Sequence, residues 1–98
     1  MMDTSQPVVS IDTQRQGDTM LIRPHLRSST PLTLRYRMTV RRSSTNGTSS
    51  INQSGDLQSD SAGSLISLTM PAGASCQVQL EVFQNDRLVQ QVESDCAD

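Results

Sequence analysis

Aromatic residues are nearly absent from this chain of 98 residues, which contains one Tyr, one Phe and no Trp. Apolar residues make up 34% of the chain. A core this small is expected to depend on regular strand pairing or on a covalent cross-link. Ser, Thr, Gln and Asn supply the polar excess, and they suit strands and turns better than long helices. The length fits a single domain over residues 1–98.

Lysine is also absent, because all eight basic residues are Arg. Residues 1–42 hold seven Arg and three Asp, a net charge of +4, whereas residues 43–98 hold one Arg and seven acids, a net charge of −6. The isoelectric point near 5.1 argues against nucleic acid as a partner. No run of about 18 apolar residues indicates a membrane span. Met1-Met2-Asp3 continues into polar sequence without a signal peptide, as a mature domain also does.

Catalytic motifs are missing as well. His25 is the single histidine, and a lone His is most often a polar strand or surface residue. Zinc needs three or four ligands, which one His and two cysteines do not supply. Neither a glycine-rich phosphate loop nor a nucleophile elbow is present. We therefore expect no enzyme activity, no metal and no cofactor.

The strongest pattern that is present is the alternation from Leu32 to Arg41. Apolar residues take every second position, which predicts a strand with one buried face. The buried face is predicted to hold Leu32, Leu34, Tyr36, Met38 and Val40, and the opposite face Thr33, Arg35, Arg37, Thr39 and Arg41.

Weaker alternation predicts further strands separated by turns. They lie at Val9–Thr13, from Met20 onward, at Leu65–Met70, at Cys76–Val82 and at Leu88–Val92, with turns at 16–18 and 85–86. Pro24 predicts that its strand is an edge or has a bulge at that point. The whole pattern indicates an all-β, immunoglobulin-like β-sandwich of about seven antiparallel strands.

A polar stretch at 43–63 is predicted to be a flexible hairpin and loop. Asn46-Gly47 favours a tight turn, so Ser43–Thr45 and Thr48–Ile51 are expected to form a short edge hairpin. Residues 55–63 are expected to form a mobile loop. We also expect residues 1–7 to be disordered.

The two cysteines are Cys76 and Cys96, and their spacing does not fit a catalytic redox pair. A hairpin turn centred on Asn85 or Asp86 would place Cys76 opposite residue 94 or 96. Both positions are even-numbered, so the two cysteines share a face. We predict a disulfide that closes the open end of the last hairpin, which would place the protein outside the cytosol. Two reduced thiols are the alternative.

Arg35, Arg37 and Arg41 form a row about 20 Å long on one strand face. One interpretation is a set of guanidinium groups that engage carboxylates or amides of an extended partner. The other is local neutralisation, in which Arg35 or Arg37 pairs with Glu81 on the neighbouring strand. Arg23 is a further candidate for partner binding, and whether Arg23 and Arg27 share this face is left open.

The strand Leu34-Arg35-Tyr36-Arg37-Met38-Thr39-Val40, the polar middle and the ending from Cys76 to Cys96 resemble the CsgC-type curli chaperones, above all the CsgH branch. The resemblance extends from about Val8 to Cys96. It implies a periplasmic, immunoglobulin-like protein that inhibits premature amyloid polymerisation of the curli subunit in biofilm-forming bacteria. It further implies electrostatic guidance through a positive patch on a strand, which Arg35, Arg37 and Arg41 match. The Cys-x-Cys pair of the CsgC branch is absent.

Two classes of function therefore remain. The first is an amyloid-inhibiting chaperone that is expected to be monomeric and to bind a disordered or nucleating curli subunit. The second is an immunoglobulin-like structural or adhesion module of a surface fibre.

Overall fold

A computed structural model describes residues 7–45, 47–59, 61–62, 64–71 and 73–96. These residues form strands and no helix. The strands are β1 (Val8–Gln16), β2 (Thr19–Arg27), β3 (Thr33–Ser44), β4 (Gly47–Gln58), the two-residue β5 (Ser61–Ala62), β6 (Ile66–Thr69), β7 (Ser75–Gln84) and β8 (Arg87–Asp95). The predicted all-β fold is confirmed.

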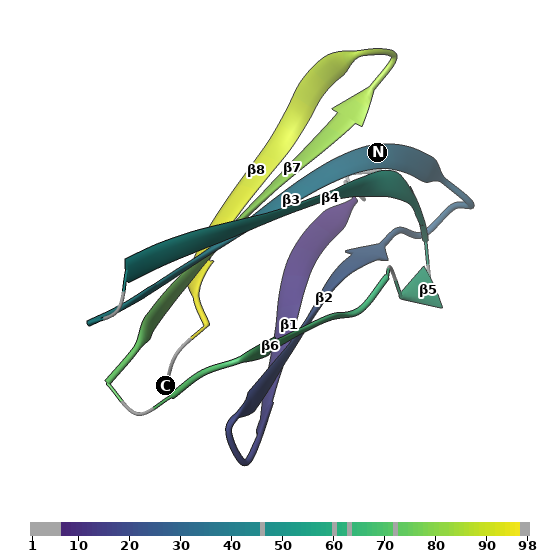
Figure 1. The fold of residues 1–98 in the computed structure, drawn as a ribbon. Coiled ribbons are helices and arrows are strands. Elements are labelled where there is room, and N and C mark those ends of the chain that lie inside the picture. The colour runs from purple at the N-terminus through teal and green to yellow at the C-terminus, as the bar shows by residue number, and fades with distance from the viewer. Residues whose placement is uncertain (1–6, 46, 60, 63, 72, 97–98) are drawn as a thin grey trace.

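Two antiparallel sheets face each other (Figure 1). In the first sheet β2 pairs with β1 on one side and with β5 and β6 on the other, and in the second sheet the order is β4-β3-β7-β8. This division into two packed sheets is the immunoglobulin-like arrangement expected from the sequence. The core between the sheets contains side chains of both, such as Ile22 and Leu26 of β2 and Met38 and Leu80 of β3 and β7.

Strand β3 follows the alternation of its sequence. Leu34, Tyr36, Met38 and Val40 are buried, whereas Arg35, Arg37 and Arg41 are exposed. Successive side chains of a strand point to opposite faces, so burial of the apolar set directs every arginine of the row away from the core.

Pro24 lies within β2, which continues past it to Arg27 without a register shift against β1. On the other side of β2, β6 pairs as far as Ile22 and β5 pairs with His25. Pro24 therefore stands in the gap between two short neighbours, where its missing N–H leaves no ladder bond unmade. Because β2 has neighbours on both sides and no register shift against β1, the prediction of an edge strand or a bulge at Pro24 is wrong.

Strand β4 corrects the expectation of a loop beginning at Gly55. Every residue of β4 pairs with β3, from Gly47 opposite Ser44 to Gln58 opposite Thr33. Leu57 is buried in the core, and a Cβ added to Gly55 would lie 3.5 Å from Cε1 of Tyr36, so the tyrosine ring covers this glycine. Leu57 and the ring of Tyr36 thus hold β4 against the core, and Ile51, opposite Val40, adds a partly exposed apolar residue to the same face.

The β3–β4 turn also lies one residue earlier than predicted. Ser44 pairs with Gly47, so the connection consists of Thr45 and Asn46, and Asn46 is outside the described residues. Most of the segment expected to be disordered, residues 1–6, is outside them too. Pro7 is described, and its carbonyl oxygen accepts a 2.7 Å hydrogen bond from Nε2 of Gln90.

The predicted disulfide joins Cys76 to Cys96 and is buried in the core. The turn at Asn85 and Asp86 has two residues with positive φ, as a tight hairpin requires. A two-residue turn alone would place Cys76 opposite Asp95. A bulge between Val82 and Phe83 adds Val89 to β8, which shifts the register by one and brings the cysteines together.

We expect Cys76→Ala with Cys96→Ala to lower the free energy of unfolding by about 3 kcal/mol, because the bond closes a loop of about 20 residues. Alanine avoids burying two unpaired hydroxyl groups. Urea denaturation of the variant and of wild type measures the difference, and intact mass with and without reductant verifies the bond. An unchanged midpoint would show that the disulfide does not stabilise the native state.

Hydrogen exchange along β4 should alternate. Because Ser44 and Gly47 pair across a two-residue connection, Gly47 and every second residue after it direct their N–H groups toward β3. The amides of Ser49, Ile51 and Gln53 should exchange slowly, and those of Ser50 and Asn52 quickly. Uniformly fast exchange would support the mobile segment expected from the sequence, and uniformly slow exchange would indicate a strand paired on both sides.

Candidate functional site

The candidate site is the solvent-facing surface of the second sheet, which we call the outer face. Its residues are set by the register, since residues directly opposite each other on neighbouring strands share a face. The outer face includes Arg35, Arg37, Thr39 and Arg41 of β3, Asn52 and Asp56 of β4, Gln77, Gln79, Glu81 and Phe83 of β7, and Gln91, Glu93 and Asp95 of β8.

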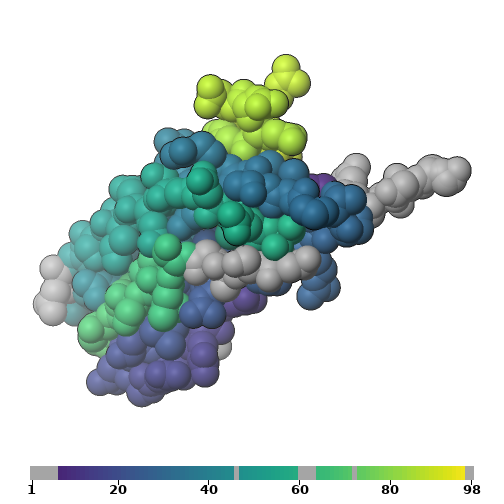
Figure 2. Space-filling view, turned by 90° about the vertical axis from the view of Figure 1, so that its right-hand side faces the viewer, coloured from purple at the N-terminus to yellow at the C-terminus, as the bar shows by residue number. Residues whose placement is uncertain are grey.

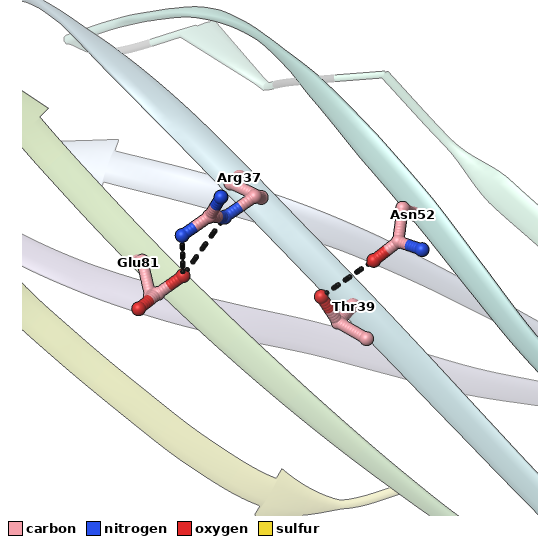
Figure 3. Close-up of polar contacts among 4 residues, drawn as sticks. All are labelled: Arg37, Thr39, Asn52 and Glu81. Atoms are coloured by element: carbon pink, nitrogen blue, oxygen red, sulfur yellow. Dashed lines mark hydrogen bonds and ion pairs between the residues drawn. The ribbon is translucent and has the colours of Figure 1, made fainter.

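Arg37 is engaged by its neighbours on β7. Its Nη2 lies 2.9 Å from Oε1 of Glu81, and its Nε donates a 3.0 Å hydrogen bond to the same oxygen (Figure 3). Its Cζ is 5.6 Å from the centroid of the Phe83 ring, within cation–π range. The expected pairing with Glu81 is therefore confirmed for Arg37, whose positive charge is largely balanced within the protein.

Arg35 and Arg41 are less constrained. The Nη1 of Arg35 is 3.9 Å from Oδ1 of Asp56, with the two side chains 67% and 64% exposed, so solvent screens this contact strongly. Among the described residues no carboxylate oxygen lies within 4.0 Å of Arg41. Within the row, these two arginines are the ones that the protein's own carboxylates hold least.

Acidic residues flank the arginine row on both sides. Asp56 lies on β4, Glu81 on β7, and Glu93 and Asp95 on β8. Three arginines thus share the described outer face with four carboxylates. The acidic half of the sequence supplies every strand beside β3, so the positive charge of this face is confined to β3 and negative side chains lie on the strands around it.

Arg23 lies elsewhere. It belongs to β2 in the first sheet and is opposite Asp12, and the residues on either side of it, Ile22 and Pro24, are buried. Its side chain is therefore on the outer surface of the first sheet, across the sandwich from Arg35. Arg27 has the same parity in β2 as Arg23, so neither arginine shares the outer face.

Two other arginines form hydrogen bonds to the backbone of another strand segment. The Nη1 of Arg42 on β3 donates a hydrogen bond to the carbonyl oxygen of Thr69. The Nη2 of Arg15 on β1 donates one of 3.2 Å to the carbonyl oxygen of Met70. Both bonds satisfy backbone acceptors at the end of β6. The sequence analysis missed these roles, since no periodicity signals a contact between distant strands.

The lateral edge of β4, on the side away from β3, is a second candidate surface. β4 is the edge strand of the second sheet, and residues 47–55 include neither a charge nor a proline, the usual devices that prevent an edge from pairing. On the outer face, Thr39 Oγ1 donates a 2.9 Å hydrogen bond to Oδ1 of Asn52 (Figure 3), which joins β3 to β4.

The other lateral side of the sandwich ends in the β7–β8 hairpin, coloured yellow-green in Figure 2, whose tip stands out from the body of the molecule. Neither a metal-ligand cluster nor a helix suited to crossing a membrane is found in the part of the chain that the structure describes.

No protein-family model and no curated protein matches this sequence. Two solved structures match. The solution structure of R. palustris CsgH is 15% identical, with 92% of each chain covered and a TM-score of 0.75. The E. coli curli protein CsgC is 16% identical, with 92% of this chain and 97% of that chain covered and a TM-score of 0.68.

The fold is that of CsgH and CsgC. Their likeness extends over both sheets, because about nine-tenths of each chain is covered. The resemblance derived from the strand Leu34–Val40 and the cysteine-bounded ending is thereby confirmed at the level of the fold. At identities of 15% and 16%, this likeness shows a shared fold and does not assign a role to any side chain of the outer face.

A double-mutant cycle between Arg37→Gln and Glu81→Gln should give a coupling of about 0.2–1 kcal/mol. The Arg37 side chain is 56% exposed and that of Glu81 is 20% exposed, so water reaches the guanidinium group and partly screens the pair. Urea unfolding of the two single variants and the double variant measures the coupling. A coupling above about 2 kcal/mol would instead make the pair a principal support of the β3–β7 contact.

Proposed function

We propose that the protein is a monomeric, periplasmic chaperone that inhibits premature amyloid polymerisation of curli subunits. The observation that carries this proposal is the likeness of the fold to CsgH over 92% of both chains. The disulfide between Cys76 and Cys96 supports an oxidising compartment, and the outer face offers charged groups to a partner in place of a catalytic constellation.

Binding in this proposal is electrostatically guided and transient. Arg35 and Arg41 project from a central strand, and the planar guanidinium group loses less rotamer entropy for each hydrogen bond that it forms than a flexible ammonium does. Exposed charges raise association rates more than they raise affinity. Such contacts suit a chaperone that meets a disordered or nucleating subunit briefly and then releases it.

Charge reversal tests this function. Arg35→Glu with Arg41→Glu should strongly shorten the delay that trace amounts of the protein impose on fibrillation of a curli subunit. Both side chains are exposed and outside the core, so the fold should be retained. The matched control is Arg27→Glu with Arg87→Glu, which alters the net charge equally at exposed positions away from the outer face. Thioflavin fluorescence over time is the readout, after amide spectra have shown that both variants are folded.

Added salt should also weaken inhibition by wild type, because exposed charges are screened within about 8 Å at physiological ionic strength.

Strand addition at the β4 edge is the rival mechanism. Inhibition by strand addition would be unaffected by both double charge-reversal variants. Ser50→Pro would weaken it, because proline removes an outward N–H group and leaves the hydrogen bonds between β4 and β3 intact. A wild-type protein that leaves fibrillation unchanged but adheres to surfaces would favour the structural or adhesion module.

A further inference from the structure

A groove lies on the outer face near the beginning of β7. Two adjoining hollows form it, and both are lined by Arg41, Gln77 and Asp95. The first, of about 390 Å³, extends to Gln79 and Glu93, and the second, of about 490 Å³, extends the other way to Ser75. Because Gln79 and Ser75 both belong to β7, the groove follows the direction of that strand.

The two walls of the groove have opposite charge. Arg41 on β3 is directly opposite Gln77, which is directly opposite Asp95 on β8. One step along, Gln79 separates Thr39 from Glu93. Neighbouring strands are about 4.8 Å apart, so the walls are roughly 10 Å apart at the backbone. The glutamine side chains of β7 form the floor between a cationic and an anionic wall.

These charges are not neutralised within the described part of the chain. Arg41, Glu93 and Asp95 make no ion pair there within 4.0 Å, whereas Arg37 and Glu81, on adjacent strands of the same face, contact each other at 2.9 Å. The difference follows from the register, because β7 places a glutamine and not an acid beside Arg41. Opposite charges are therefore held apart across a space wide enough for another chain.

We propose that this groove binds an extended segment of the partner chain in which an acidic residue is adjacent to a basic one. Successive side chains of an extended chain point to opposite sides. A chain lying along β7 would thus present its carboxylate to Arg41 and its cation to Glu93 and Asp95, while the glutamine amides bond its backbone. This rests on the proposed function, deepens it by stating the chemistry of the bound segment, and assigns the contact to Arg41.

Titration with short capped peptides tests the groove directly. The probes are three hexapeptides of Ser and Thr with a central Asp-Lys, Asp-Asp or Lys-Lys pair, added to ¹⁵N-labelled protein. Shifts of the side-chain amides of Gln77 and Gln79 and of the Arg41 Nε–H report binding. The Asp-Lys peptide should bind about fivefold more tightly than either of the others, as expected for two exposed ion pairs in place of one attraction and one repulsion.

Matched variants assign the walls. Arg41→Gln should abolish the preference for Asp-Lys over Lys-Lys, and Glu93→Gln with Asp95→Asn should abolish the preference for Asp-Lys over Asp-Asp. Arg27→Gln, on the opposite side of the sandwich, should change neither. Equal affinity for all three peptides, shifts confined to other surfaces, or no shifts at millimolar peptide would overturn the proposal.

The groove and the proposed function fail separately. Peptide selectivity without any delay of curli fibrillation by the same protein would reject the function and keep the groove. A delay that persists in Arg41→Gln, together with absent peptide selectivity, would reject the groove and keep the function.

Discussion

The central position of β3 in the second sheet is the constraint on which the rest of the structure depends. β3 pairs with β4 over its whole length and with β7 over most of it, and its even-numbered residues supply core contacts to the first sheet. Because strand geometry couples the two faces, the burial of Tyr36 and Met38 determines the direction of Arg35 and Arg37. A slip of one residue would bury arginines and expose the core.

Neighbouring strands then decide what each exposed arginine can do. Glu81 lies beside Arg37 and balances it, Asp56 lies beside Arg35 at a longer distance, and Arg41 has a glutamine for its neighbour on β7. Three arginines of one strand thus differ in how closely a carboxylate of the protein pairs with them. The register distinguishes them, whereas the sequence pattern left open whether Arg35 or Arg37 pairs with Glu81.

Sequence periodicity was sufficient for β3, for the turn at Asn85–Asp86 and for the shared face of the cysteines, because each depends on local spacing. It was insufficient for β4, whose polar residues have no alternation and which is held by Leu57 and by the ring of Tyr36 over Gly55. The bulge that aligns Cys76 with Cys96 and the placement of Arg23 in the first sheet depend on contacts between distant strands. Local patterns do not encode such contacts.

The most direct test of the central claim is a map of amide shifts on ¹⁵N-labelled protein as monomeric curli subunit is added at low salt. The account predicts that the perturbed residues gather on the outer face of β3, β7 and β8, around Arg41 and Gln77, and that the signals of β1 and β2 stay in place. Perturbations that follow the β4 edge, or that lie on the first sheet around Arg23, would contradict it.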